Sequence, residues 1–150
     1  MAIEIDLGKR GSADFIVQHY ASHLKSSMKM AVIEAMRQLT ISTPVDTGRA
    51  RWGWFCTVNA FSDSVPDEVP DGWQGKSSGG TPFFQQPDVV SRVQEIGDYQ
   101  ISDTLYITNN VSYIVKLNGG SSRQAPARFV EKAAANAGIA VERFLKSKQG

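Results

Sequence analysis

The sequence predicts one α+β domain over residues 1–150: a small antiparallel sheet, two long helices packed on one face of it, and a long inserted loop or hairpin. Two long stretches with the apolar period of a helix lie near the two ends of the chain. Short stretches with the alternation of a strand lie before the first helix and between the two. The length of 150 residues is typical of a single domain.

The composition excludes several classes of protein. Hydrophobic residues make up 41% and charged residues 21% of the chain, which argues against disorder over its whole length. The formal net charge of +1 is too balanced for a protein whose main partner is a phosphate backbone. Cys56 is the only cysteine, so the chain cannot form an internal disulfide. No stretch is typical of a secretion signal or a membrane span, and we expect a protein folded in a reducing cytoplasm, with no membrane partner.

The first strand and the first helix follow from the spacing of apolar residues. Residues Ile3–Leu7 alternate apolar and acidic side chains, as a half-buried strand does, and two nearby glycines end the pattern. From Ser12 to Leu39 apolar residues recur every three or four positions, which predicts a long amphipathic helix with Ser12 as its N-cap. Because Pro44 disfavours a helical conformation at the residue before it, the helix should end before Thr43.

The stretch TPVDTGRARWGW, Thr43–Trp54, follows this helix. Asp46 can bond the backbone downstream of it and Gly48 can adopt a left-handed conformation, so Val45–Gly48 is predicted to be a tight corner. The repeated glycines and the lysine of a nucleotide-binding loop are lacking, so a structural corner is favoured over a phosphate site. Beyond the corner the alternation predicts a strand whose inner face carries Ala50, Trp52, Trp54, Cys56 and Val58.

The second half of the chain begins with a long irregular segment. Residues 60–86 contain several prolines and glycines and no sustained period, so we expect a flexible loop or an extended hairpin there. The elements predicted after it are a short helix over Pro87–Ile96, a strand over Tyr99–Asn109, an apolar run over Val111–Leu117 that ends at Asn118-Gly119-Gly120, and a closing helix over Ala127–Lys146. The buried stripe expected on the closing helix consists of Phe129, Val130, Ala133, Ala137, Val141, Phe144 and Leu145.

No group of residues indicates catalysis. His19 and His23 lie four positions apart on the predicted helix and could share a metal ion, but no third ligand accompanies them, so a polar helix flank is favoured. Cys56, on the inner face of a strand, is more typical of a buried hydrophobic residue than of a nucleophile. No pair of carboxylates lies in an apolar setting, so no general acid–base pair can be named. We expect no enzyme activity, no cofactor and no metal.

Three large aromatic residues, Trp73, Phe83 and Phe84, stand among polar residues and glycines in the segment 60–86. Buried in the core of the chain they would be ordinary. In a mobile loop they would be exposed anchors for a partner, as aromatic hot spots are. We favour the second interpretation. Trp52 and Trp54 are more typical of core or subunit-interface residues than of a platform for stacking bases.

Two stretches together resemble one protein family. TPVDTGRARWGW resembles the corner (S/T)PVDTG-R-(L/A)-x-x-(S/G)-W of the tail-completion, or head–tail joining, proteins of long-tailed bacteriophages. The second stretch, Asn109–Ala137, resembles a later signature of that family, although Asn118 stands where the family usually has glutamate and Ile114 where it often has alanine. The matching residues are Pro44, Asp46, Thr47, Gly48, Arg49 and Trp54 in the corner, and Tyr113, Gly120, Pro126 and Phe129 in the second stretch.

The resemblance implies a structural protein of the virion and not an enzyme. Wedge-shaped α+β subunits of such proteins form a ring, usually of six, in the neck between head and tail. The ring would contact the portal-proximal adaptor, or head-closure protein, on one side and the tail terminator or tail tube on the other. DNA would only pass through the lumen, and assembly would take place in the host cytoplasm. The candidate interface residues are Trp73, Phe83, Phe84, Arg51, Asn118 and Arg123.

Two alternatives remain open from the sequence. A tail terminator that caps the tail tube belongs to the same structural class. A small nucleic-acid-binding module would use Arg49, Arg51, Arg123, Arg128 and the strand tryptophans, and its binding would depend steeply on salt.

Overall fold

The computed structural model describes most of the chain. The described residues are 1–5, 14–70, 73, 89–94, 96–123 and 125–148, and the side chains of 5, 14–23 and 148 are excluded from the description.

The sheet has three antiparallel strands in the order β1-β3-β2. These strands are β1 (Ala2–Ile5), β2 (Trp54–Val58) and β3 (Leu105–Asn109). Ile107 in the central strand lies opposite Ile3 on one side and Cys56 on the other. Because partners in register point to the same face of a sheet, these residues and their alternate neighbours form its apolar face.

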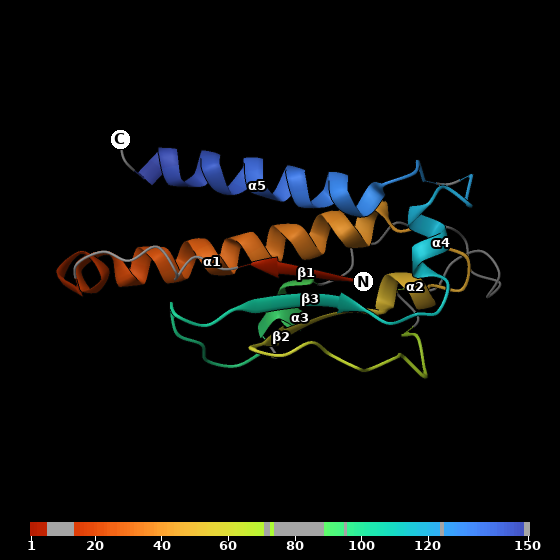
Figure 1. Cartoon of the computed structure of the whole chain (residues 1–150), viewed down its shortest axis with the longest axis horizontal. Coiled ribbons are helices and arrows are strands. Elements are labelled where there is room, and N and C mark those ends of the chain that lie inside the picture. The colour runs from red at the N-terminus through yellow and green to blue at the C-terminus, as the bar shows by residue number, and fades with distance from the viewer. Residues whose placement is uncertain (6–13, 71–72, 74–88, 95, 124, 149–150) are drawn as a thin grey trace.

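Two long helices lie on one side of the sheet (Figure 1). The first, α1 (Asp14–Ser42), contacts all three strands, and the last, α5 (Phe129–Lys148), packs along α1. Three short helices complete the fold: α2 (Arg49–Trp52), α3 (Val89–Gln94), which contacts α1 and β2, and α4 (Ile114–Asn118). This arrangement confirms the predicted α+β fold class.

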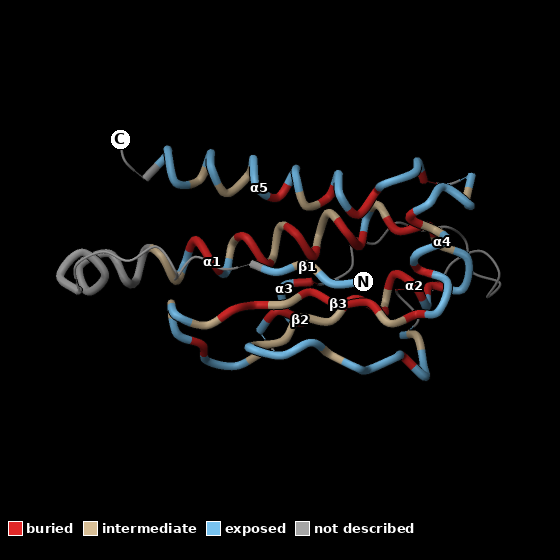
Figure 2. The backbone as a smooth tube through the Cα atoms, viewed as in Figure 1, coloured by how far each residue is buried: buried red, intermediate tan, exposed pale blue. Residues whose placement is uncertain are grey.

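The core lies between the sheet, α1 and the first half of α5 (Figure 2). Met28, Val32 and Leu39 of α1 are fully buried, and they pack with Leu105 and Ile107 of the central strand in one cluster. The stripe predicted on α5 is buried as far as Ala137, whereas Leu145 near its end is 38% exposed. The end of α5 therefore contributes little to the core.

Two predicted strands are shorter than expected. Residues 49–52 form a helical turn instead of the beginning of a strand, and β2 starts at Trp54. The alternation over Ala50, Trp52 and Trp54 suggested a strand, but Ala50 and Trp54 are also four apart, which is the helical spacing. Residues 99–104 are irregular, with a turn at 101–102, and the amides of Tyr99 and Gln100 donate to the side chains of Asp98 and Asp103.

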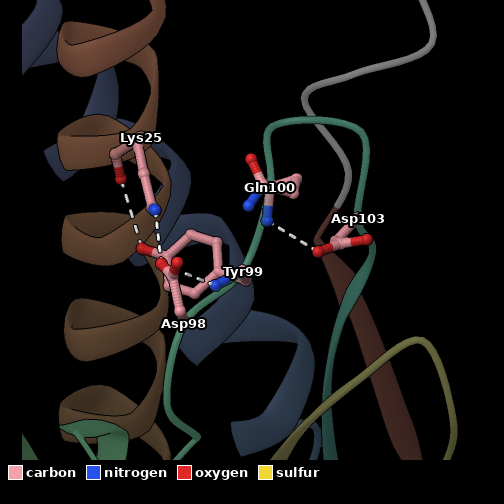
Figure 3. Close-up of polar contacts among 5 residues, drawn as sticks. All are labelled: Lys25, Asp98, Tyr99, Gln100 and Asp103. Atoms are coloured by element: carbon pink, nitrogen blue, oxygen red, sulfur yellow. Dashed lines mark hydrogen bonds and ion pairs between the residues drawn. The ribbon is translucent and has the colours of Figure 1, made fainter.

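A polar cluster fastens the turn before β3 to α1 (Figure 3). Lys25 of α1 donates from Nζ to Oδ1 of Asp98 at 2.5 Å, and the Tyr99 hydroxyl donates to the Lys25 carbonyl oxygen at 3.3 Å. The Lys25 ammonium group, the nearest cation, holds the pKa of Asp98 below its ordinary value. Because Asp98 is largely exposed, this cluster is a contact at the surface.

Candidate assembly surface

The predicted corner after α1 is built around the side chain of Thr43, which is 1% exposed. Its hydroxyl donates to the Leu39 carbonyl oxygen at 2.6 Å and accepts from Nε1 of Trp54 at 2.9 Å. One hydroxyl therefore binds the end of α1 to the start of β2. Pro44, the next residue of the same stretch, is also buried.

The glycines of the corner have distinct structural roles. Gly48 has a φ of 86°, the left-handed conformation that the sequence predicted, and its carbonyl oxygen accepts from the Trp52 amide at 2.8 Å. A Cβ at Gly53 would lie 2.8 Å from Cγ2 of Val111 and 3.1 Å from the Arg49 carbonyl oxygen. Gly53 is therefore required for close packing between the two stretches.

Asn109 connects the corner to the end of β3. Its side chain is fully buried, donates from Nδ2 to the Ala50 carbonyl oxygen at 2.8 Å, and accepts from the Val111 amide at 3.0 Å. Asn109 is the first residue of the second stretch that resembles the family, and Ala50 belongs to the first. The two stretches are thus one connected structural unit.

Three of the candidate interface residues, Arg51, Asn118 and Trp73, are buried within the single chain, so none of them is exposed to a partner there. Arg51 is 8% exposed, and its guanidinium donates to the Thr43 carbonyl oxygen at 3.3 Å. Burial lowers the pKa of Arg51.

Asn118, at the end of α4, is 7% exposed. It accepts from the Val130 amide and donates to Oε2 of Glu131, both at 2.9 Å, so it caps the start of α5.

A shallow groove of about 360 Å³ runs between the two stretches. Residues Pro44–Ala50 line one side, and Tyr113, Leu117 and Ser122 line the other. Tyr113 is 38% exposed, and the neighbouring Val115 is 64% exposed. Of the motif residues, Asp46, Thr47 and Arg49 are exposed beside this groove, and Arg123 is exposed close to Ser122 in the chain. The groove is therefore the place where exposed residues of both stretches meet.

Trp73 is not an exposed anchor, which corrects the prediction. It is 8% exposed and packs edge-on against Trp52, with ring centroids 4.8 Å apart. The Arg92 guanidinium lies over the Trp52 ring at 3.9 Å and within 5.6 Å of the Trp73 centroid, as in cation–π contacts. No feature of the sequence singled out Arg92. Phe83 and Phe84 lie outside the described residues, so the prediction for them stays untested.

The described part of the long segment, residues 59–70, is held against the rest of the chain. The Phe61 ring packs on the Tyr106 ring of β3 at 4.5 Å between centroids. Asn110 donates from Nδ2 to the carbonyl oxygens of Ser62, at 2.6 Å, and Ser64, at 3.1 Å. Phe61 is nevertheless 64% exposed. This part has no helix or strand, and the expectation that 60–86 is a flexible loop or an extended hairpin stays a prediction.

The remaining chemical candidates do not form a reactive site in the described part of the chain. Burial raises the pKa of the Cys56 thiol to about 12, so thiolate is scarce at neutral pH. Among the described residues no group of three or more His, Cys, Asp or Glu could hold a metal ion, and the side chains of His19 and His23 are not among them. No described helix is long and apolar enough to cross a membrane.

Comparisons of the chain with protein-family models, with curated proteins and with solved structures gave no significant match.

Proposed function

We propose that this chain is a virion structural protein of a long-tailed bacteriophage, which forms a ring at the neck and joins the DNA-filled head to the tail. The observation that carries the proposal is the union of the two resembling stretches through Asn109 and Gly53. Two motifs that lie apart in the sequence form one structural unit with an exposed groove between them. This is the arrangement expected if both motifs serve one contact surface.

The nucleic-acid alternative loses part of its support from the burial of Arg51 and Trp54, whereas Arg49, Arg123 and Arg128 are exposed. Arg51 is 8% exposed and Trp54 is fully buried, so neither can meet a phosphate or stack on a base. Trp52 is already covered by Arg92 and Trp73. A balanced net charge of +1 is also compatible with a lumen through which DNA slides without sticking.

The deciding experiment is electron microscopy of lysates from the phage that carries this gene, with the gene disrupted. The proposal predicts filled heads beside separate, finished tails of normal length. A plasmid copy of the gene, supplied in the same host, should restore joined particles and serves as the control.

Each other outcome would indicate a different function. Tails of abnormal length would identify the tail terminator instead of the joining protein. Intact, joined particles from the disrupted phage would overturn the structural proposal. Purified protein should also bind DNA only weakly at physiological salt, and tight binding that falls steeply with salt would favour the nucleic-acid module.

A further inference from the structure

The ordered segment 59–70 presents acidic and apolar side chains on the surface. Asp63, Asp67 and Glu68 are exposed, and no Lys or Arg occurs between residues 59 and 70. Val65, between two of these acids, is 42% exposed. Figure 1 shows the segment on the side of the sheet away from α1 and α5. We call Phe61–Glu68 the acidic ledge.

Cationic residues lie in, or next in sequence to, the lining of the groove between the two resembling stretches. Arg49 lines it, Lys116 precedes the lining residue Leu117, and Arg123 follows the lining residue Ser122. All three cations are exposed, as is the apolar Val115, and Asp46 is the acid among the lining residues. Leu117 of α4 is among its lining residues, and α4 lies at the end of the molecule where α1 ends and α5 begins (Figure 1). We call it the basic groove.

The charges of both surfaces lack partners within the described structure. The ion pairs between described residues involve other side chains, such as Lys25 with Asp98 and Lys146 with Glu142. Neither the acids of the ledge nor Arg49, Lys116 and Arg123 take part in one with another described residue. Among the described residues, no ion pair therefore competes with a partner of opposite charge at either surface.

We propose that the acidic ledge of one copy of this chain docks into the basic groove of the next copy. Val65 supplies the apolar side chain for the groove, and the flanking acids face the cations around it. The contact uses two different surfaces of each copy, and repetition of such a head-to-tail contact produces a closed ring when the rotation closes. This inference rests on the proposed function, because it names the interface from which the ring would be built.

Two charge reversals and their combination test the docking. The basic reversal is Lys116→Glu with Arg123→Glu, and the acidic reversal is Asp67→Lys with Glu68→Lys. Each alone should weaken self-association of the purified protein at least about tenfold in sedimentation velocity at low salt, because like charges then meet. An equimolar mixture should recover association to within about threefold of wild type, because alternating copies restore opposite charges at every contact.

The same variants are also tested by their ability to form infectious particles. This assay tests the docking if the wild-type protein is monomeric in solution. Supplied singly to the phage with the disrupted gene, each reversal should abolish infectious particles, and co-expression of both should restore them. The control, Lys29→Glu with Arg143→Glu, changes net charge as the basic reversal does but at exposed positions on α1 and α5. It should behave like wild type.

Normal assembly of either reversal, or no recovery on combining them, would overturn the docking. That result would leave the neck function standing if the disrupted gene still gives separate heads and tails. Joined particles without the gene would overturn the neck function. The docking would then stand only if the purified wild type self-associates and the reversals weaken that association, and a monomeric wild type would overturn the docking as well.

Discussion

At the scale of single residues, the Thr43 hydroxyl is the junction of the corner, because it both donates and accepts. It uses its proton on the Leu39 carbonyl oxygen and its lone pair on the Trp54 indole N–H. Trp54 is the largest fully buried side chain among the described residues. A buried indole N–H without an acceptor is costly, so this one oxygen fixes how Trp54 sits in the core.

Replacing Thr43 with Val should therefore destabilise the protein. The shape is nearly kept, but the Trp54 Nε1–H loses its acceptor, which costs about 1–3 kcal/mol. Urea unfolding of wild type and variant measures the difference. Thr47→Val is the matched control, because Thr47 is exposed and its hydroxyl only accepts from the Arg49 amide at 3.3 Å. Equal losses in both variants would contradict the role given to Thr43.

Residues that act through distant partners were beyond the reach of the sequence. The left-handed conformation of Gly48 followed from local turn chemistry, and the structure confirms it. The sequence suggested Asn118 as part of a chain break before two glycines and as a candidate interface residue, but not as a helix cap. Its role as the cap of α5 depends on residues 12 and 13 positions later, which no local pattern reveals. Arg92 likewise depends on Trp52, 40 positions earlier.

At the scale of elements, the long segment after β2 is fastened to the domain at two places. Phe61 packs on Tyr106 near its start, and Trp73 is inserted beside Trp52 and Arg92. Proline and glycine content alone suggested a loop that stays apart from the core. Composition could not show that one tryptophan of the segment fills a place in the core, because that depends on the position of α3.

Trp73→Ala should unfold more readily than wild type. Removal of a buried tryptophan costs about 3–5 kcal/mol, and here it also removes a ring from the Arg92 contact. Phe61→Ala is the comparison from the same segment, and it should cost far less because Phe61 is 64% exposed. Thermal unfolding of both variants checks the order. A Trp73→Ala protein as stable as wild type would contradict its place in the core.

At the scale of the whole molecule, exposed carboxylates make the free energy of unfolding depend on pH. The pKa values of Asp98, Asp103 and Glu131 are lowered, in each case chiefly by a hydrogen bond: from Lys25, from the Gln100 amide and from Asn118 respectively. A group with a lowered folded-state pKa contributes stability above its unfolded pKa, which is about 4 for these side chains. That contribution is lost as pH falls through the folded-state pKa.

The free energy of unfolding should therefore be nearly constant from pH 7 to about pH 5 and should fall below about pH 4. Urea titrations at several pH values measure it. Lys25→Met removes the first cause of the Asp98 shift, so the variant should lose less stability than wild type between about pH 4 and pH 2. An identical acid dependence in the two proteins would show that the Lys25–Asp98 pair does not contribute.

The fold class could be predicted from the sequence because it depends on the period and order of elements. Both long helices and all three strands were expected near the places where they occur. Their relative positions were not accessible, because these contacts join segments far apart in the chain: Trp54 pairs with Asn109, Ala2 pairs with Thr108, and α5 packs on α1. The groove between the two resembling stretches depends on those positions. The sequence therefore suggested residues of both stretches but could not show that they line one groove.

The strand order has a consequence for the time course of folding. The central strand of the sheet is the last of the three to be synthesised, so β1 and β2 have no partner until residue 109 has been made. Similarly, the face of α1 that packs on α5 stays uncovered until α5 has been synthesised. Contacts over such long separations require closure of large loops, which slows folding relative to helical bundles of similar size. During synthesis on the ribosome, the apolar side chains of α1 therefore lack their partners on β3 and α5 until those late segments have been made.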